Sequence, residues 1–191
     1  MASIHQKILI ITAPSGAGKT SITHYLMKEF PMLEFSISAT TRSIRGNEEN
    51  GKDYYFISIE EFKQKIQHKE FAEWEMVYEG KYYGTLKTEM KRIWASEKVP
   101  VLDVDVKGAI HVQQQYPENT LSVFIEAPSI EELKNRLLAR GTENEESINA
   151  RMNKASYEIS FKDQFDKIII NDDLDTACKK AKALVTEFLQ S

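Results

Sequence analysis

Four short apolar runs stand out along the chain, and none of them alternates with polar residues. They cover residues 7–12, 99–103, 121–126 and 167–171. Apolar runs of this length, rich in Val, Ile and Leu, are typical of strands that are buried on both faces. A sheet made of such strands needs helices above and below it.

Helical spacing of apolar residues appears between these runs. It predicts helices over residues 20–30, 86–95 and 174–189, and a further helix that begins at Ser129. Thr85 is placed to cap the second of these helices, and Ser129 with Glu131 and Glu132 has the pattern of a capping box. Strands that alternate with helices predict an α/β fold with a parallel sheet covered on both faces.

Residues 35–85 have a different texture, in which aromatic side chains and short extended runs dominate. A helix is expected over residues 59–66, and residues 77–83 have the pattern of a β-hairpin. We therefore expect a small mixed α+β lobe inserted into a core of residues 1–34 and 86–191. At 191 residues, the whole chain has the length of a single domain.

Composition and charge exclude several classes of protein. The net charge is −4, so the chain has no general attraction for a nucleic acid. The single cysteine, Cys178, cannot form a disulfide within the chain, and it argues against a thiolate zinc site. No apolar run approaches the ~20 residues that span a bilayer, and the N-terminus lacks the pattern of a secretory signal. These features predict a cytoplasmic protein with no membrane partner, and they leave its oligomeric state open.

A Gly-rich turn between the first predicted strand and helix has the pattern of a phosphate-binding loop. Its residues are Ala13, Pro14, Ser15, Gly16, Ala17, Gly18, Lys19 and Thr20. They match the pattern G-x-x-x-x-G-K-[ST] except for Ala13 at the first glycine. Gly16 and Gly18 let backbone N–H groups point at phosphate oxygens, Lys19 would contact the β- and γ-phosphates of ATP, and Thr20 would bind Mg²⁺. The alternative is a turn that only connects a strand to a helix.

Acidic residues follow the second apolar run. Residues 101–103 have the pattern of a Walker B strand that ends in Asp103, with a second acid at Asp105. A carboxylate at this place can orient Mg²⁺ and its water ligands. A strand that ends in a solvated turn fits the same spacing equally well.

A series of further stretches has a recognisable order. They are APSGAGKT at 13–20, SISATTRSIRG at 36–46, NGKDYYF at 50–56, FAEW at 71–74, YYGT at 82–85, LDVDVKG at 102–108, RLLARGTE at 136–143 and INDDL at 170–174. In this order they resemble the guanylate kinase family over nearly the whole chain, from residue 8 to about residue 189. The resemblance implies a P-loop NTPase-type core that binds ATP, a GMP-binding lobe at about residues 35–85, and a helical lid at about residues 136–151.

The resemblance also implies which residues form each site. The GMP-site positions are Ser38, Arg42, Arg45, Tyr54, Glu73, Tyr83, Thr85 and Asp105. The positions that carry positive charge around the transferred phosphoryl group are Lys19, Arg45, Arg136, Arg140 and Arg151, and Asn171 resembles an adenine contact. Three departures from the family are small. Thr85 stands where many relatives have serine, Ile44 stands where proline is usual, and Arg45 is followed by Gly46, Asn47 and Glu48 instead of a more compact acidic turn.

The phosphate of GMP explains the basic and phenolic residue types at these positions. Arg42 and Arg45 can fork onto phosphate oxygens, and the hydroxyls of Tyr54 and Tyr83 can donate to them. Without the family resemblance, two exposed arginines in a solvated loop would be the simpler interpretation.

Guanine explains the carboxylates. It offers N1–H and N2–H₂ as adjacent donors, which Glu73 can accept together, while Asp105 can accept a remaining N2 hydrogen and the Ser38 or Thr85 hydroxyl can donate to O6. Adenine would leave a buried carboxylate unpaired, which corresponds to a rejection of roughly 10⁴-fold. A surface acid is the ordinary role of any single glutamate.

Arginines flank a polar segment at residues 141–146. Arg136 and Arg140 lie one helical turn apart, and Arg151 lies on the next helix. We expect this segment to close over the nucleotides and to exclude water. Surface ion pairs with glutamates one turn away are the alternative for the arginines, and a turn is the alternative for Asn171.

These expectations combine into one function. They predict ATP-dependent, in-line phosphorylation of GMP, and of dGMP, to the diphosphate with Mg²⁺, in purine nucleotide metabolism. One alternative is a binding module, because guanylate-kinase-like domains of scaffold proteins keep the fold, often with a damaged P-loop; here Gly18, Lys19 and Thr20 are intact. A kinase for another phosphorylated small molecule is the other alternative, and the predicted guanine-binding side chains argue against it.

Overall fold

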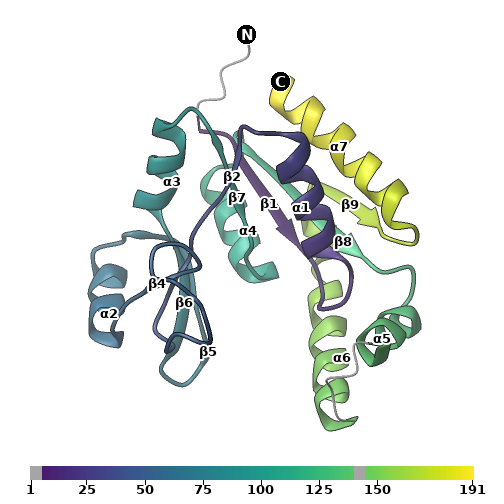
Figure 1. Ribbon diagram of the computed structural model, residues 1–191, viewed down its shortest axis with the longest axis horizontal. Coiled ribbons are helices and arrows are strands. Elements are labelled where there is room, and N and C mark those ends of the chain that lie inside the picture. Colours follow the sequence, from purple (N-terminus) through teal and green to yellow (C-terminus); the bar gives the residue numbers. More distant parts are fainter. Residues whose placement is uncertain (1–5, 140–144) are drawn as a thin grey trace.

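Two β-sheets organise the chain in the computed structural model, which describes residues 6–139 and 145–191 (Figure 1). The first sheet has the strand order β2–β7–β1–β8–β9, and every neighbouring pair in it is parallel. Its strands are β1 (Ile8–Thr12), β2 (Leu33–Phe35), β7 (Val99–Leu102), β8 (Thr120–Glu126) and β9 (Lys167–Ile170). The predicted α/β fold with a parallel sheet is therefore confirmed.

The second sheet is smaller and mixed, with the order β4–β3–β6–β5. Its strands are β3 (Ala39–Thr40), β4 (Tyr55–Phe56), β5 (Phe71–Tyr78) and β6 (Lys81–Leu86). β3 pairs with β4 in parallel and with β6 antiparallel, and β5 and β6 form the predicted hairpin. All four strands come from the part of the chain with the different sequence texture.

Helices connect the strands, and all of them except α2 belong to the part of the chain that forms the parallel sheet and its cover. They are α1 (Lys19–Glu29), α2 (Ile59–Gln67), α3 (Lys87–Ala95), α4 (Val106–Gln115), α5 (Ile130–Ala139), α6 (Glu145–Ile159) and α7 (Leu174–Gln190), with a short 3₁₀ helix at Lys162–Gln164. Among the described helices, none combines the length and the apolar character that crossing a bilayer requires.

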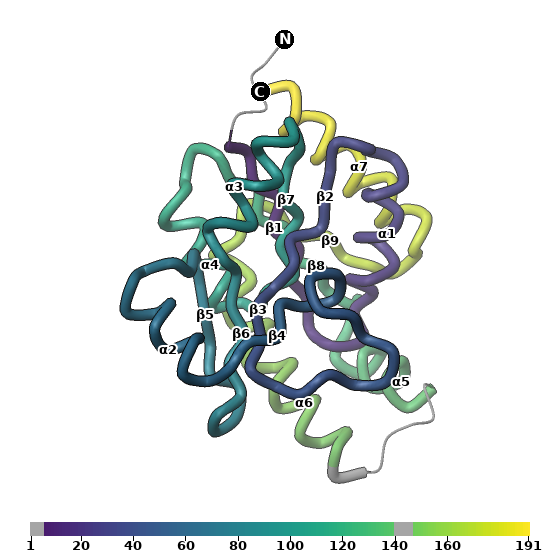
Figure 2. Tube along the Cα trace, turned by 60° about the vertical axis from the view of Figure 1, so that its left-hand side comes forward, coloured from purple at the N-terminus to yellow at the C-terminus, as the bar shows by residue number. Residues whose placement is uncertain are grey.

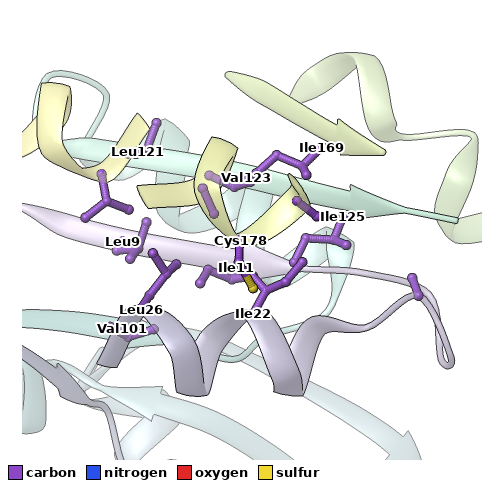
Figure 3. Close-up of a cluster of buried hydrophobic side chains, with 14 of the residues drawn as sticks. Leu9, Ile11, Ile22, Leu26, Val101, Leu121, Val123, Ile125, Ile169 and Cys178 are labelled. Carbon is purple, nitrogen blue, oxygen red and sulfur yellow. The ribbon is translucent and has the colours of Figure 1, made fainter. Parts of the chain in front are cut away.

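The core of the parallel sheet follows from the pleat of β1. Leu9 and Ile11 face α1 and α7, whereas Ile8 and Ile10 face α3 and α4, and all four side chains are buried. Figure 3 shows the first of these layers, in which Cys178 of α7 lies among the aliphatic side chains as a small apolar residue. An apolar run buried on both faces explains why β1 shows no alternation with polar residues.

The second sheet has a core of its own on the face that α2 covers. Phe62 of α2 is fully buried and stacks on Phe71 of β5 with ring centroids 4.3 Å apart. Figure 2 shows this small unit beside α3 and α4. It is therefore built on the core sheet instead of standing apart from it.

Most predicted elements are confirmed, and one detail is wrong. Ser129 caps α5 as predicted, since its Oγ accepts from the Glu132 N–H at 3.0 Å. Thr85 does not cap the helix that follows it: the residue before α3 is Leu86, without a side-chain cap, and Thr85 belongs to β6. The short strand β2 and the helix α4 were not predicted. β2 has only three residues, and α4 has a glycine in its first turn and β-branched side chains at Val106, Ile110 and Val112.

Candidate active site

The candidate site lies where the parallel strands end. The loops after β1 and β7 carry the Gly-rich turn and Asp103 to Asp105, and Asn171 follows β9. The carboxyl ends of parallel strands form one edge of a sheet, which is the usual place for ligands in such folds. Two cavities meet at this edge, and they share Asp103, Val104, Asp105 and Lys154 in their walls.

The first cavity, of about 770 Å³, lies over the Gly-rich turn. The predicted residues that line it are Ala13, Pro14, Ser15, Gly16, Gly18, Lys19, Thr20, Asp103, Asp105 and Arg151. Lys19 binds the Asp103 carboxylate, and Arg151 Nη1 of α6 donates to Ser15 Oγ at 3.0 Å. The turn predicted as a phosphate loop, the acid predicted after β7 and one predicted lid arginine therefore surround one space.

Asn171 holds the Gly-rich turn against the end of β9. Its side-chain Nδ2 donates to the Ala17 carbonyl at 2.8 Å, and its backbone N–H donates to the Glu126 carbonyl at 2.7 Å. Gly18 has φ +101°, and a Cβ added there would lie 2.1 Å from Asn171 Nδ2. The glycine is required both by the left-handed backbone and by the close approach of the amide.

Oxygen donors at the same cavity fit Mg²⁺. The Thr20 hydroxyl and the Asp103 carboxylate both line it. The described residues contain no group of three or more His, Cys, Asp or Glu side chains arranged for a metal ion. A sparse set of one or two oxygen ligands is what Mg²⁺ requires when phosphates and waters complete its octahedron.

The second cavity, of about 290 Å³, lies between the parallel sheet and the mixed sheet. The predicted residues in its wall are Ser38, Tyr54, Glu73, Tyr83, Asp103 and Asp105. Its floor is the buried Glu73, which is 8% exposed and accepts from the Thr85 hydroxyl at 2.6 Å. Burial raises the pKa of Glu73 to about 7, while the Thr85 hydroxyl opposes that rise.

Two further carboxylates stand beside Glu73. Asp105 caps α4, since its Oδ1 accepts from the Gly108 N–H at 2.8 Å. A hydrogen bond with Asp105, together with burial, raises the pKa of Glu75 to about 7. Gly108 leaves room for the Glu73 carboxylate, because a Cβ added at Gly108 would lie 2.8 Å from Glu73 Oε2. Glu75 was not predicted, although its spacing of two residues from Glu73 on one strand places both on the same face.

Ser36 is a second cavity residue that was not predicted. Its side chain lines the same cavity, is 3% exposed, and its Oγ is the one buried side-chain polar atom without a partner among the described residues. Buried hydroxyls are normally hydrogen-bonded, so an unpaired one at a cavity wall is suited to a ligand. A serine in an extended run carries no sequence signal of this kind.

Arg42 lies behind the wall of the second cavity. It is 9% exposed, donates to both Glu48 oxygens at 2.6 Å, and lies over the Tyr54 ring at 4.8 Å. The hydrogen bonds from Arg42 hold the pKa of Glu48 at about 2. Glu48 was not predicted as the partner of Arg42, because no local pattern marks the pair. Arg45 is exposed on the adjoining loop, where its backbone N–H donates to Glu48 at 2.9 Å.

The remaining predicted lid residues are only partly described. Arg136 pairs with Glu132 one helical turn away at 2.8 Å and donates to the Asn171 carbonyl at 3.0 Å. Arg136 therefore forms the ion pair with a glutamate one turn away that was the alternative interpretation. Its second hydrogen bond, to Asn171, connects α5 to the end of β9. Arg140 lies outside the described residues, as does most of the predicted polar segment at 141–146.

Comparisons with known proteins indicate the same family over nearly the whole chain. The family model "Guanylate kinase" matches residues 5–188. A guanylate kinase of Bacteroides fragilis is 48% identical over 183 residues, which are 96% of this chain and 90% of that protein. A guanylate kinase of Porphyromonas gingivalis is 46% identical over 96% of this chain and 98% of its own length.

A solved structure agrees in fold as well as in sequence. The crystal structure of guanylate kinase from Anaplasma phagocytophilum superposes with a TM-score of 0.75 at 27% identity, and the match covers 100% of this chain and 89% of that one. The residues that the family model matches, 5–188, span the Gly-rich turn, the mixed sheet and the acids after β7. The chain therefore belongs to the guanylate kinase family.

Proposed function

We propose that the chain transfers the γ-phosphoryl group of ATP to GMP, which gives ADP and GDP. The observation that carries the proposal is the pair of adjoining cavities, one over the Gly-rich turn and one over the buried Glu73. A phosphate oxygen of GMP attacks the γ-phosphorus while its bond to the β–γ bridging oxygen breaks. Two nucleotides that meet at the shared wall would have the in-line arrangement that this transfer requires.

ATP takes the larger cavity. Backbone N–H groups of the Gly-rich turn and the start of α1 receive its phosphates, and Lys19 exchanges Asp103 for the β- and γ-phosphate oxygens. Mg²⁺, held by Thr20 and through water by Asp103, would neutralise charge on these phosphates. Asn171 orients the turn through Ala17, and an adenine contact from its remaining amide atoms is compatible with that role.

GMP takes the smaller cavity with its base on Glu73. The ionised carboxylate accepts from guanine N1–H and N2–H₂, and Asp105 accepts the other N2 hydrogen. The hydroxyls of Ser36 and Ser38 line the same space as donors for O6, and Thr85 holds Glu73 in place. Adenine lacks the N1 proton, so it would leave the buried carboxylate without its donors.

The GMP phosphate lies toward Arg42, Tyr54 and Tyr83. Arg42 is fixed by Glu48 and by the Tyr54 ring, and Tyr54 and Tyr83 meet edge to face at 6.1 Å. Arg45 reaches the same phosphate from its exposed loop. A guanidinium that is already oriented loses little freedom on binding, which strengthens the contact.

Arginines of α5 and α6 would add positive charge around the transferred phosphoryl group when the lid approaches the two nucleotides. Arg151 already lies beside the Gly-rich turn at Ser15, and Arg136 lies at the end of β9. Together with Arg140 they would surround the transferred group, and closure of the segment at residues 141–146 would keep water from taking the phosphoryl group. We extend the proposal to dGMP as a second acceptor and to purine nucleotide metabolism in the cytoplasm, where both nucleotides are available.

The experiment that tests this function measures ADP formation from ATP and Mg²⁺ with GMP, dGMP, AMP, UMP or CMP in turn. We expect rapid turnover with GMP and dGMP and a loss of at least about 10²-fold in Lys19→Met. Lys28→Met, at an exposed position of the same helix, is the matched control. Full activity of Lys19→Met, or a preference for another monophosphate, would contradict the proposal.

A further inference from the structure

A buried carboxylate outside both cavities joins the two sheets. Glu89 of α3 is 3% exposed, although it lines neither cavity wall. It accepts from the Tyr55 hydroxyl of β4 at 2.8 Å, from the Ile37 N–H at 3.3 Å, and from Arg92 at 2.8 and 2.9 Å. Donors from the mixed sheet, from the β2–β3 connection and from α3 therefore converge on one side chain.

The contacts continue into the parallel sheet. Arg92 Nη2 lies 2.7 Å from Glu34 of β2, and Lys98 Nζ lies 2.7 Å from the other oxygen of Glu34. We call these six residues the Glu89 network: Glu34, Ile37, Tyr55, Glu89, Arg92 and Lys98. The chain passes between the sheets at residues 36–38 and 87–98. Ile37 lies in the first of these connections, and Glu89, Arg92 and Lys98 lie in the second.

The network keeps Glu89 ionised in spite of its burial. Burial by itself raises the pKa of this carboxyl, but the hydrogen bonds from Arg92, Tyr55 and Ile37 together hold it below the usual value. A buried ion of this kind stabilises a fold less than apolar packing does, but its directional bonds define one geometry. The network is therefore better suited to fixing an orientation than to adding stability.

The orientation that it fixes is that of Arg42. Tyr54, Tyr55 and Phe56 are consecutive, so the side chains of Tyr54 and Phe56 share one face and Tyr55 takes the other. The guanidinium of Arg42 lies 4.8 Å from the Tyr54 ring centre and 5.4 Å from that of Phe56. The residue between these two rings is the one that Glu89 holds.

We propose that Glu89 is a positioning residue for GMP, which holds β4 through the Tyr55 hydroxyl and thereby sets the place of Arg42 relative to the sheet that carries the Gly-rich turn. The proposal rests on the proposed role of Arg42 as a ligand of the GMP phosphate. Glu89 touches neither substrate, so its effect is confined to the phosphate end of GMP.

The test uses Tyr55→Phe, which removes one hydroxyl and keeps the ring, and Glu89→Gln as a second variant. We expect each to raise KM for GMP about 5- to 20-fold, because Arg42 loses its fixed position, while KM for ATP changes less than about twofold. Inhibition by guanosine, which has no phosphate, should keep its wild-type constant. Tyr82→Phe is the matched control, since this ring packs on Phe62 in the same unit.

Three outcomes overturn the proposal: an unchanged KM for GMP in both variants, an equal loss for GMP and ATP, or an equal loss for GMP and guanosine. The last two would indicate general loosening. Arg42→Lys is measured in parallel for the proposed function. If Arg42→Lys leaves KM for GMP unchanged, the assignment of the phosphate site fails, whereas an effect of Arg42→Lys without one of Tyr55→Phe refutes the role of Glu89 alone.

Discussion

At the scale of single residues, burial gives ordinary side chains unusual properties at this site. Glu73 is a carboxyl whose pKa rises to about 7 because it is almost fully buried. Ser36 is a hydroxyl that the fold leaves without a partner among the described residues. Both groups are costly in the free protein and become satisfied when a ligand offers matching polar atoms.

Glu73 should make the stability of the free protein depend on pH. Its folded pKa of about 7 exceeds the ordinary 4.5, so the folded state holds the extra proton between these values. Its contribution to the free energy of unfolding therefore falls as pH rises from about 4.5 through about 7. Urea denaturation at pH 5 and pH 8 should show a smaller decrease for Glu73→Gln than for the wild type. An equal decrease in both would contradict the assignment.

Ser36→Ala should separate stability from binding. Removal of an unpaired buried hydroxyl should leave the melting temperature of the free protein unchanged or raise it. The same change should raise the dissociation constant for GMP about 3- to 10-fold, because a donor to the guanine base is lost. Thermal unfolding and calorimetric titration with GMP measure the two effects. A variant that is less stable and binds GMP normally would show that the hydroxyl has a structural partner.

At the scale of elements, the Gly-rich turn depends on a strand far away in sequence. Asn171 after β9 holds Ala17, and Gly18 is the residue that lets its amide approach. The turn is thus shaped by contacts between β1, α1 and β9 as well as by its own glycines.

Gly18→Ala should damage this arrangement more than backbone strain alone explains. Its added methyl would lie 2.1 Å from the Asn171 amide, whereas one at Gly46, where φ is +54°, meets nothing within 4 Å. We expect a rise in KM for ATP of at least about tenfold and a lower melting temperature for Gly18→Ala, and a much smaller effect on stability for Gly46→Ala.

The double variant Gly18→Ala/Asn171→Ala tests the cause. If the clash is responsible, the second substitution should restore part of the melting temperature that Gly18→Ala loses, so the two effects are not additive. Strict additivity would mean that the close approach of Asn171 is not what excludes a side chain at Gly18.

Elements built from local patterns could be predicted, and pairs that form across the fold could not. The non-alternating runs identified β1, β7, β8 and β9, and the turn of residues 13–20 stands in the strand–helix context expected for phosphate binding. In contrast, the pairs Arg42–Glu48 and Glu89–Tyr55 depend on where loops and sheets meet. The role of Thr85 could not be predicted for the same reason. Its hydroxyl donates to Glu73 on the neighbouring strand and does not cap the helix that follows.

At the scale of the whole molecule, the site is a junction between two sheets. The larger cavity belongs to the parallel sheet, the smaller one lies against the mixed sheet, and the acids after β7 form their common wall. Relative placement of the two sheets therefore controls how the two substrates face each other.

A single molecule that joins adenosine to guanosine through a chain of phosphates should exploit this junction. Because the cavities share a wall, such a compound should bind at least about 10²-fold more tightly than ATP or GMP alone. Calorimetric titration with the linked compound and with each nucleotide measures the difference. Affinity no greater than that of the better single nucleotide would mean that the two sites are not occupied together.

Selection of guanine by the buried Glu73 carboxylate can be measured as kcat/KM for GMP and for AMP in the wild type and in Glu73→Gln. Glu60→Gln, at an exposed position of α2, is the control for loss of a glutamate from the same unit. We expect a preference for GMP of roughly 10⁴-fold in the wild type and in the control. Glu73→Gln should reduce this preference by at least about 10²-fold, mainly by lowering kcat/KM for GMP. A preference that Glu73→Gln leaves unchanged would contradict this role of Glu73, because the guanine base would then be recognised elsewhere.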